Sequence, residues 1–482
     1  MTKLFGTDGI RGIALTELGC ETAMRLGKAV AAAAAAARES GRAKILIGKD
    51  TRASGDVLEA ALEAGICSAG ADVYVLGVIP TQGVAMLTEY YAADAGIMIT
   101  ASHSPAEYNG IKIFARSGFR LSEKEEEDLE KLIFNDEWQK LSVGPGRIGR
   151  IYYEEKAEWD YIRRVVHSID CDLRGLKVVI DCANGAAARY AKRIYEGMGA
   201  NCFMIGCDPN GFNINEGCGV NDLSLLRDAV VKRKFDLGVA FDGDGGKCII
   251  VDEKGDVIDG DKMLAVFAKF LKVQGKLKSN TCVATVMSNL GLTRFGERED
   301  ITIANTAVGS GNVLDRMLRF GYNLGGEQNG HIIFLDCEKI GDGEITAARF
   351  MEVMRKTRRR ASELAGIMET VPQMIKNVPM PPEKRGVWAE NAEFREMVSE
   401  YKKKLGADGR IIVRESGTEN MVRIMVEGKR TGVIIEYAQN LEQKLTEIMK
   451  AKSEKQLLNE KMLREITDET YNGLSVLPEL KT

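Results

Sequence analysis

The sequence has no excess of either charge, no long apolar run and no metal-type cysteine spacing. Its 66 Lys and Arg residues nearly balance its 70 Asp and Glu residues, so no basic surface for nucleic acid is indicated. The longest run of small apolar residues, 29–37, follows Lys28 and ends at Arg38, which is too short to span a bilayer. We therefore expect neither a nucleic-acid partner nor a membrane partner.

The ten cysteines are scattered along the chain without the spacing of metal ligands. Most of them lie in apolar runs, which predicts buried free thiols. The first residues, MTKLFG, do not have the architecture of a signal peptide, and we expect a cytoplasmic protein. At 482 residues the chain is too long for a single core, and its length predicts three or four domains.

Alternating strand and helix patterns fill the first three quarters of the chain. Apolar runs predict strands at 44–49, 72–76, 96–99, 176–182, 201–205, 235–241 and 281–286. Amphipathic or capped segments predict helices at 56–69, 122–134, 159–166, 186–198, 221–232, 262–271, 312–320 and 344–364. This alternation favours parallel sheets that helices cover on both faces.

The pattern divides into three α/β domains followed by a smaller α+β domain. A Gly/Pro-rich segment at 143–146 separates the first two, and a hairpin at 409–413 and 421–426 with a helix at 434–449 indicates the last. The expected domains are 1–155, 156–258, 259–368 and 369–450, with a charged extension at 451–482. The predicted fold class is α/β, with mixed, mainly parallel sheets, a C-terminal α+β domain and a central cleft.

The segment 96–114, GIMITASHSPAEYNGIKIF, organises the first domain. A buried strand ends at a polar loop that contains Ser102 and His103, and Lys112 lies on the returning strand. Ligands of open α/β sheets bind outside the carboxyl ends of the strands, which would display Ser102 at a site. The alternative is a turn whose Ser and His bond only to local backbone, and spacing alone does not decide between the two.

A second polar loop, FDGDGGK at 241–247, follows another buried strand. Its Asp242 and Asp244 are hard oxygen ligands that suit Mg²⁺, and the surrounding glycines let the backbone curl round an ion. The alternative is a plain Gly-rich turn, which the preceding strand makes less favoured. No Gly-x-Ser-x-Gly segment surrounds Ser102, so acyl transfer is disfavoured.

These loops, with FGTDGIRG at 5–12, GGEQNGH at 325–331 and RESGTE at 414–419, resemble the α-D-phosphohexomutases over roughly residues 1 to 450. The resemblance implies that Ser102 carries the phosphoryl group passed to and from a sugar. It implies that His103 and Lys112 orient phosphate and accept or give protons, and that Arg11, counted among the catalytic residues, lines the floor near Ser102 with Arg52. It also implies Mg²⁺ as cofactor, held by Ser102, Asp242 and Asp244.

The remaining loops imply the substrate contacts. Glu327, Asn329 and His331 would recognise the sugar, and a carboxylate at Glu327 would suit a protonated 2-amino group. The non-transferring phosphate would be bound by Arg414, Ser416, Gly417, Thr418 and Arg423. Because Gln328 is typical of the amino-sugar branch, the expected reaction interconverts glucosamine 6-phosphate and glucosamine 1-phosphate through a 1,6-bisphosphate, for amino-sugar nucleotide and cell-wall precursor synthesis.

Several positions depart from the family pattern. The third metal-loop Asp is Gly246 and the following Arg is Lys247; the others are Ser104, Ser310, Gly311, Asn329, Glu415 and Asn420. One rival is a catalytically impaired paralogue that acts as a sugar-phosphate sensor or partner subunit. It is favoured by Gly246, Ser310, Gly311 and Glu415 and opposed by the intact Ser102, Asp242, Asp244 and Arg414. A second rival is a sister enzyme that uses mannose or glucose phosphates. The sequence does not indicate an oligomeric state.

Overall fold

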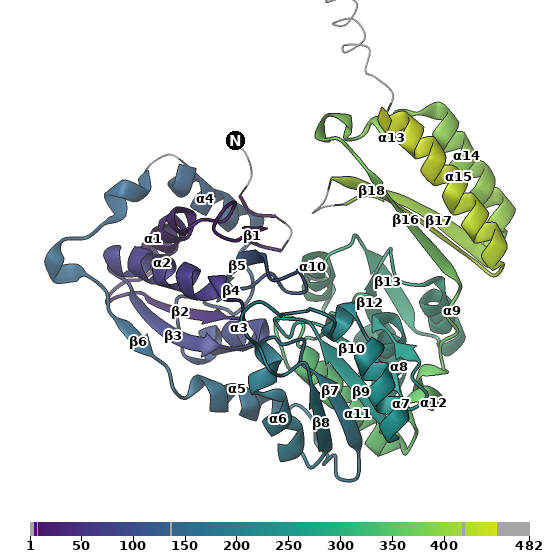
Figure 1. The fold of residues 1–482 in the computed structure, drawn as a ribbon, viewed down its shortest axis with the longest axis horizontal. Helices are drawn as coiled ribbons and strands as arrows, with labels where there is room; N and C mark the ends of the chain where they lie inside the picture. The colour runs from purple at the N-terminus through teal and green to yellow at the C-terminus, as the bar shows by residue number, and fades with distance from the viewer. Residues whose placement is uncertain (1–3, 7, 135–136, 417–419, 451–482) are drawn as a thin grey trace, which may run out of the picture. The chain divides into compact units, whose positions relative to one another are not determined.

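The computed structural model of the chain describes residues 4–6, 8–134, 137–416 and 420–450. They belong to two compact units, Met1–Thr370 and Val371–Thr482. Figure 1 shows the elements of each unit. The extension expected at 451–482 lies outside the described residues.

The first sheet has six strands in the order β1-β5-β4-β2-β3-β6. They are β1 (Ile10–Ile13), β2 (Lys44–Lys49), β3 (Asp72–Val78), β4 (Ala95–Ile99), β5 (Tyr108–Ala115) and β6 (Ile151–Tyr153). The strands β4, β2, β3 and β6 pair in parallel, whereas β5 pairs antiparallel with β4 and with β1. The loop that carries Ser102, which we call the nucleophile loop, therefore connects β4 and β5, two strands that are neighbours in the sheet.

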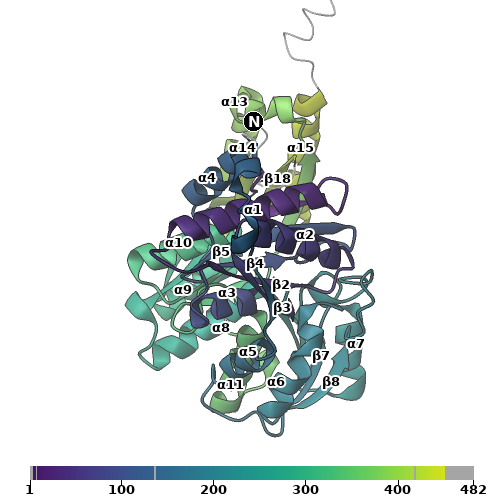
Figure 2. The same cartoon turned by 90° about the vertical axis from the view of Figure 1, so that its left-hand side faces the viewer.

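Helices cover both faces of this sheet (Figure 2). They are α1 (Cys20–Ala36), α2 (Ser54–Ser68), α3 (Thr81–Tyr90) and α4 (Glu123–Phe134). Ile45 and Ile47 pack into the core cluster of α1 and α2, while Leu46 packs into the cluster of α3, as alternation along a strand requires. The predicted capping box at α4 is confirmed, because Ser122 N–H donates to Glu125 Oε2 at 2.7 Å and Glu125 N–H donates to Ser122 Oγ at 3.4 Å.

The second sheet has the order β11-β10-β9-β7-β8. Its elements are α5 (Ala157–Val166), β7 (Lys177–Asp181), η3 (Ala186–Arg189), α6 (Ala191–Gly197), β8 (Asn201–Ile205), η4 (Gly219–Asn221), α7 (Ser224–Arg233), β9 (Leu237–Phe241), β10 (Cys248–Asp252) and β11 (Val257–Ile258). The prediction of one helix over 186–198 was wrong: it divides at Tyr190, whose φ of −113° departs from helical geometry. The helix predicted from 221 begins at Ser224.

The third sheet has the order β13-β12-β14-β15. Its elements are α8 (Gly260–Val273), β12 (Thr281–Thr285), α9 (Leu290–Glu299), β13 (Thr302–Thr306), α10 (Ser310–Phe320), β14 (Leu324–Gly326), β15 (Ile332–Phe334), α11 (Gly343–Thr357) and α12 (Ala361–Ala365). The single helix predicted over 344–364 was also wrong. Arg358 adopts a left-handed φ of 55° and ends α11.

One hydrophobic core joins the three sheets of the first unit. It contains side chains from all of them, including Met98 of β4, Phe241 of β9 and Phe334 of β15, together with Tyr161, Phe267 and Ile345 of the covering helices. The sheets are mixed: β9, β7 and β8 pair in parallel, as do β13, β12 and β14, and each sheet ends in antiparallel strands. The predicted class of three α/β domains with mixed, mainly parallel sheets is confirmed.

The second unit is a three-stranded antiparallel sheet in the order β16-β18-β17 with helices. Its elements are β16 (Gln373–Pro379), α13 (Val387–Glu390), α14 (Ala392–Leu405), β17 (Gly409–Glu415), β18 (Met421–Gly428) and α15 (Thr431–Lys450). The hairpin predicted from the sequence is β17 with β18. The smaller C-terminal α+β domain is thus confirmed.

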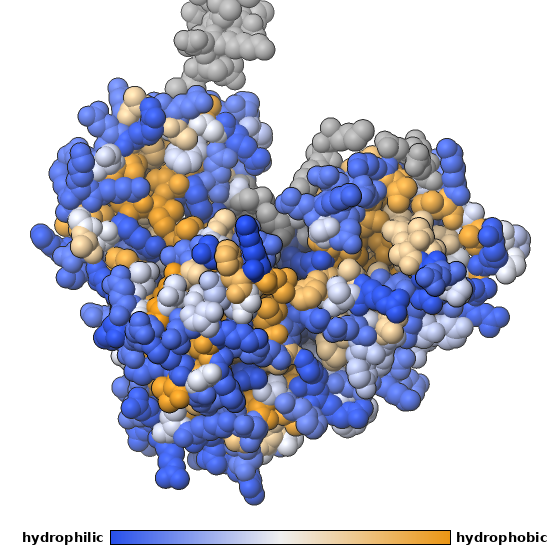
Figure 3. Space-filling model, turned by 180° about the vertical axis from the view of Figure 1, so that it is seen from behind, coloured by the Kyte–Doolittle hydropathy of each residue, from blue (hydrophilic) through white to orange (hydrophobic). Residues whose placement is uncertain are grey.

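Hydrophilic residues predominate on the face of the molecule shown in Figure 3, with smaller hydrophobic areas between them. Among the described residues, no helix combines the length and the apolar character that crossing a membrane requires. The run at 29–37 forms the second half of α1, where Ala29, Val30 and Ala31 are buried in the first unit.

Candidate active site

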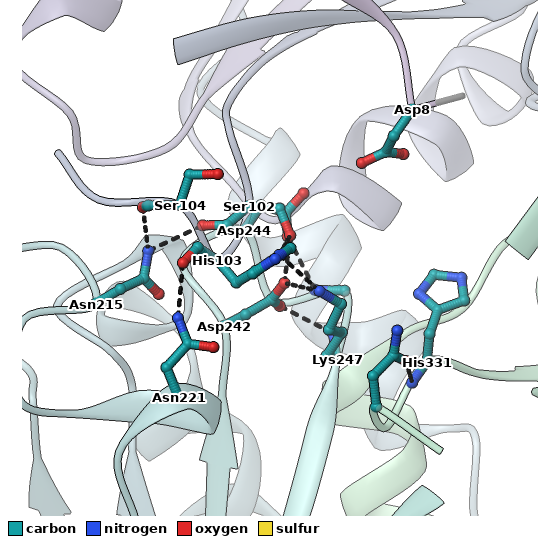
Figure 4. A network of polar contacts seen from close by, with 12 residues as sticks. Asp8, Ser102, His103, Ser104, Asn215, Asn221, Asp242, Asp244, Lys247 and His331 are labelled. Atoms are coloured by element: carbon teal, nitrogen blue, oxygen red, sulfur yellow. Dashed lines mark hydrogen bonds and ion pairs between the residues drawn. The ribbon is translucent and has the colours of Figure 1, made fainter. Parts of the chain in front are cut away.

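Ser102 lies at the carboxyl end of β4, and only 4% of its surface is exposed. Its φ of 54° falls in the left-handed region, which costs a non-glycine residue roughly 1–2 kcal/mol. The Ser102 N–H donates to Thr100 Oγ1 at 2.8 Å, and its Oγ donates to Asp242 Oδ2 at 2.5 Å. The predicted nucleophile is therefore held in a strained conformation against a carboxylate (Figure 4).

Asp242 and Asp244 follow β9 and are fully buried, with 0% and 1% of their surface exposed. Lys112 Nζ donates to Asp244 Oδ2 at 2.8 Å, and Thr81 Oγ1 donates to the same oxygen at 2.5 Å. Burial and the Asp244 charge raise the pKa of Asp242 to about 6. Burial alone would raise the pKa of Asp244 too, but the Lys112 ammonium and these hydrogen bonds lower it.

Gly243 and Gly246 of this loop differ in whether a side chain would fit at their positions. A Cβ on Gly243 would lie 2.6 Å from the carbonyl oxygen of Ser102, so no side chain fits where the two loops meet. A Cβ on Gly246 would lie 3.4 Å from Asp244 Oδ1 and 3.9 Å from His331 Nδ1, which are ordinary contacts. There is therefore room for the Cβ of an aspartate at position 246, where the family pattern has its third carboxylate.

The side chain of Lys247, the last residue of the loop 241–247 (the metal loop), contacts the nucleophile loop. Its Nζ lies 2.7 Å from His103 Nδ1 and 3.7 Å from Asp242 Oδ2. The Lys247 charge, followed by burial, lowers the pKa of His103 to about 4. Because an ammonium can only donate, His103 Nδ1 is the acceptor, and the imidazole is neutral at pH 7.

Arg11 belongs to a cluster of cations around Asp8. The Asp8 carboxylate forms ion pairs with Arg11 and Arg120, and its Oδ2 lies 3.5 Å from Lys112 Nζ. Burial alone would raise the pKa of Asp8, yet the charges of Arg120, Lys112 and Arg11 hold it well below its usual range. The cluster has more positive than negative charge, as a phosphate site requires.

Arg52 lies beneath the nucleophile loop, with 1% of its surface exposed. Its Nε donates to Asp50 Oδ2 at 2.9 Å. The guanidinium also donates to four backbone carbonyls, those of Ser102, Ser104, Pro105 and Tyr108. Arg52 thus supports the loop from below.

Asn215 and Asn221, which lie between β8 and α7, also bind the backbone of this loop. The sequence analysis did not identify them. Asn215 Nδ2 donates to the carbonyls of Ser102 and Ser104 at 2.9 and 3.0 Å. Asn221 Nδ2 donates to the carbonyl of His103 at 2.7 Å. Their contacts span more than a hundred residues of sequence, and no local motif marks them.

The predicted sugar loop is the turn between β14 and β15. Glu327 is 8% exposed, and its Oε1 accepts from Gly309 N–H at 3.0 Å. Asn329 Oδ1 accepts from His331 N–H at 3.1 Å, within the turn. Burial raises the pKa of Glu327 and, with the charges of Arg120 and Lys247, lowers the pKa of His331 to about 4.

Gln328 is directed toward α8 rather than along the turn. Its Nε2 donates to Asp259 Oδ2 at 3.3 Å, and its carbonyl accepts from Gly260 N–H at 2.9 Å. Asp259 is the N-cap of α8, so Gln328 fixes the turn to the start of that helix.

In the second unit, Arg414 and Arg423 are opposite each other on β17 and β18. Ser416 N–H donates to the carbonyl of Met421 at 2.8 Å and closes the hairpin. Glu415 Oε1 accepts from Gly386 N–H at 2.7 Å and from Trp388 Nε1 at 2.9 Å, so its carboxylate is occupied at α13. The predicted ligands Gly417 and Thr418 lie outside the described residues.

The structure brings some of the predicted residues of the first unit into direct contact, whereas others interact only through their charges. Ser102 is in contact with Asp242 and His103, whereas Lys112 is hydrogen-bonded to Asp244 and, through Asp8, linked to Arg11. The two groups interact through the charges of Asp242 and Asp244. Lys247 acts electrostatically on Glu327 and His331. Within the described part of the chain, no group of three or more His, Cys, Asp or Glu side chains is placed to hold a metal ion.

Family comparisons match the chain in four consecutive segments. The matches are to phosphoglucomutase/phosphomannomutase alpha/beta/alpha domain I at 2–140, domain II at 159–255 and domain III at 259–371, and to the C-terminal domain at 375–444. These matches define the class, an isomerase that acts by phosphoryl transfer. The chain belongs to the phosphoglucomutase/phosphomannomutase family.

Its sequence is similar to curated phosphoglucosamine mutases. The enzyme of Desulforamulus reducens is 47% identical over 429 residues, which cover 89% of this chain and 96% of that protein. The enzyme of Clostridium acetobutylicum is 46% identical over 430 residues, which cover 89% and 95%.

Solved structures share the fold at lower identity. A phosphoglucomutase/phosphomannomutase family protein of Burkholderia thailandensis has a TM-score of 0.76 at 22% identity, covering 94% of this chain and 99% of that one. The N-acetylphosphoglucosamine mutase of Aspergillus fumigatus, in complex with GlcNAc-6P and magnesium, has a TM-score of 0.64 at 16% identity, covering 92% and 96%.

Proposed function

We propose that the chain is a phosphoglucosamine mutase that interconverts glucosamine 6-phosphate and glucosamine 1-phosphate in the cytoplasm. The observation that carries the proposal is the 2.5 Å hydrogen bond from Ser102 Oγ to Asp242, whose pKa is raised by the charge of Asp244, the partner of Lys112. A serine beside two carboxylates and cationic side chains suits phosphoryl transfer, because charge on the transferring group must be neutralised. Similarity to phosphoglucosamine mutases at 45–47% identity supports the substrate.

The cofactor of this proposal is Mg²⁺, held by Asp242, Asp244 and Ser102 Oγ. The residues fit a cation in their chemistry, because Asp242 and Asp244 are buried oxygen ligands two residues apart and the Asp244 charge raises the pKa of Asp242. Two carboxylates suffice for Mg²⁺, which completes its shell with water and phosphate oxygen. When bound, the ion would neutralise charge on the phosphoryl group.

The forward reaction begins with Ser102 phosphorylated. The C1 hydroxyl oxygen of glucosamine 6-phosphate attacks phosphorus, the bond from phosphorus to Ser102 Oγ breaks, and the hydroxyl proton ends on Ser102 Oγ. Arg11 and Lys112 orient the phosphoryl group by charge. The neutral His103 can accept a proton in transit, and Lys112 can donate one.

The resulting 1,6-bisphosphate reorients, and Ser102 Oγ attacks the 6-phosphoryl group. The O6–phosphorus bond breaks, and the Ser102 proton moves to O6, which leaves glucosamine 1-phosphate and restores phosphoserine. Glu327, Asn329 and His331 bind the sugar, with Glu327 as partner of the 2-amino group. The other phosphate binds to Arg414, Ser416, Gly417, Thr418 and Arg423.

In this proposal each domain contributes one loop. Domain 1–155 supplies the phosphoserine loop, 156–258 the metal loop, 259–368 the sugar loop and 369–450 the phosphate loop. Water exclusion around the bisphosphate protects it from hydrolysis while it reorients.

A second candidate is an impaired paralogue that binds a sugar phosphate without turnover. It is favoured by Gly246 and by the two ammonium groups, Lys112 and Lys247, that already neutralise the carboxylates. A metal ion would compete with both lysines for Asp242 and Asp244.

The deciding experiment has two readouts on one preparation. Fragment-ion mass spectrometry locates phosphate on Ser102 rather than on Ser104. Phosphorus NMR then follows glucosamine 6-phosphate with Mg²⁺ and glucose 1,6-bisphosphate, beside the glucose and mannose 6-phosphates. We expect phosphoserine 102 and the fastest conversion with the amino sugar. Binding of glucosamine 6-phosphate without phosphoserine and without turnover would establish the paralogue instead.

A further inference from the structure

The carbonyls of three consecutive residues in the nucleophile loop, Ser102, His103 and Ser104, all accept hydrogen bonds from distant side chains. Arg52 Nη2 donates to Ser102 at 3.0 Å and to Ser104 at 2.8 Å from the segment between β2 and α2. Asn215 donates to the same two carbonyls from the segment between β8 and η4 (Figure 4). The loop is therefore held by donors from both the first and the second α/β domain.

Asn221 completes the second side. Its Nδ2 donates to the carbonyl of His103, which lies between the two carbonyls that Asn215 binds. We call the segment 206–221, which contains both asparagines, the clamp segment. The side chains of the clamp segment donate to the backbone carbonyls of the nucleophile loop. Asp242, by contrast, accepts from the side chain of Ser102.

The clamp segment is hydrogen-bonded to the last residue of β7 and to the residues that follow this strand. Asp181, the last residue of β7, accepts from Ala183 N–H at 3.0 Å and from Gly219 N–H at 2.8 Å. Asn215 N–H donates to the carbonyl of Ala183 at 2.8 Å. The position of Asn215 is therefore set by the second sheet and not by the loop that it binds.

We infer that Asn215 and Asn221 are positioning residues for Ser102. The left-handed φ of Ser102 persists only where its surroundings impose it. The clamp segment imposes it from the second α/β domain, the same domain in which Asp242 follows β9. Ser102 Oγ and Asp242 are thereby held by one domain, which keeps the distance between them short. The kinetic consequence rests on the proposed function, because it is measured as mutase rate.

Substitution of Asn215 by aspartate tests this with little change of shape. Asn215 has a φ of 60°, which aspartate tolerates better than alanine. In Asn215→Asp an acceptor replaces a donor opposite two carbonyl oxygens, and Asn221→Asp does the same opposite His103. Asn210→Asp is the matched control on the same segment, because Asn210 Oδ1 accepts from Phe212 N–H at 2.9 Å and aspartate keeps that acceptor.

Two readouts decide the matter. Hydrogen exchange of the peptide covering 100–107 should quicken in Asn215→Asp and Asn221→Asp and stay unchanged in Asn210→Asp. The kcat of the two clamp variants should fall about tenfold or more while KM changes less than about threefold, since an ångström of misplacement costs about 10²-fold in rate. A general loss of stability would also lower the apparent kcat at unchanged KM, so the inference requires that exchange quicken at 100–107 and not throughout the chain.

Each outcome has a distinct meaning. An active natural protein whose exchange and kcat are unchanged in Asn215→Asp overturns the inference and leaves the proposed function intact. A natural protein without mutase activity overturns the proposed function, and the exchange comparison still decides whether the clamp holds the loop. If Asn215→Asp does not fold, Asn221→Asp, at an exposed position, decides by the same two readouts.

Discussion

The ammonium of Lys247 lies 2.7 Å from Nδ1 of His103. The contact joins two loops that are far apart in the sequence, and the same ammonium lies 3.7 Å from Asp242 Oδ2. Lys247 is thus a fixed positive charge between the nucleophile loop and the carboxylates. It stabilises the neutral imidazole, because a protonated His103 would face a like charge at hydrogen-bond distance.

Replacing Lys247 by methionine should raise the pKa of His103 from about 4 toward its ordinary value, since Lys247 is the largest cause of the depression. NMR of ¹³C-labelled histidine can follow this, because the chain has only three histidines. Lys232→Met, at an exposed lysine paired with Asp228, is the control and should leave the titration of His103 in place. An unchanged titration in Lys247→Met would mean that burial and the charge of Arg11 depress this pKa without Lys247.

Ser102→Ala should remove nearly all mutase activity and leave the fold intact. The side chain donates a short hydrogen bond to Asp242, whose loss costs about 1 kcal/mol, and has a longer contact of 3.4 Å with His103 Nδ1. Thermal unfolding and the rate of glucosamine 1-phosphate formation, measured on the same sample, check both parts. Substantial activity in this variant would place the phosphoryl carrier elsewhere.

Glu327→Gln should weaken the preference for the amino sugar. A hydrogen bond between charged groups contributes about 1.5–3 kcal/mol, so the ratio of kcat/KM for glucosamine 6-phosphate to that for glucose 6-phosphate should fall at least tenfold. Gln328→Met is the comparison, and its effect should be smaller, because the Gln328 amide donates to Asp259 at the start of α8. The reverse order would assign the selection to Gln328.

The sequence predicts those parts of the site that are local in the chain. Ser102, Asp242 and Asp244 each follow a buried strand within a few residues, and Lys112 lies on the strand that returns from the Ser102 loop. Asn215 could not be found in this way, because its function depends on contacts with Ser102 and Ser104 that only the packing of two sheets creates.

The errors in secondary structure have local physical causes. Arg358 and Tyr190 interrupt helices whose residue pattern continues across them, and a single backbone conformation decides each break. The short strands β14 and β15 flank a glycine-rich turn, and three-residue strands are too short for a recognisable alternation. Propensity patterns predict long elements better than their interruptions.

Asp181 should make stability depend on pH in an unusual direction. Its carboxyl is fully buried, and burial raises its pKa from 3.8 to about 6. The folded protein therefore binds the proton more tightly than the unfolded chain. Its contribution to stability is complete below pH 4 and is lost as the pH rises through 6. Two pKa units correspond to about 3 kcal/mol.

The measurement is urea unfolding of the natural protein and of Asp181→Asn between pH 3.5 and 7. The free energy of unfolding of the natural protein, relative to the variant, should decline by about 3 kcal/mol over this range. Other carboxyl groups titrate in both proteins and cancel in the difference. A difference that is constant with pH would show that the pKa of Asp181 is the same in the folded and the unfolded protein.

Gly246 provides the sharpest test of the metal loop, because a side chain fits there without strain. The added Cβ would be 3.4 Å from Asp244 Oδ1, and Gly246 does not have a positive φ. Each anionic ligand attracts a divalent ion directly, so Gly246→Asp should lower the Mg²⁺ concentration for half-maximal rate and raise turnover. Gly246→Asn, of the same size but uncharged, is the control.

Metal binding can also be read without activity. Before Mg²⁺ is added, a third carboxylate beside two buried ones should destabilise Gly246→Asp by repulsion, and saturating Mg²⁺ should then raise its Tm more than that of Gly246→Asn or of the natural protein. A natural protein that is inactive at every Mg²⁺ concentration, beside an active Gly246→Asp, would identify the chain as the impaired paralogue. If the natural protein is active and Gly246→Asp changes neither the Mg²⁺ dependence nor the Tm shift, the loop 241–247 does not hold the metal, and the buried pair of Asp242 and Asp244 must instead serve Ser102 and Lys112 directly.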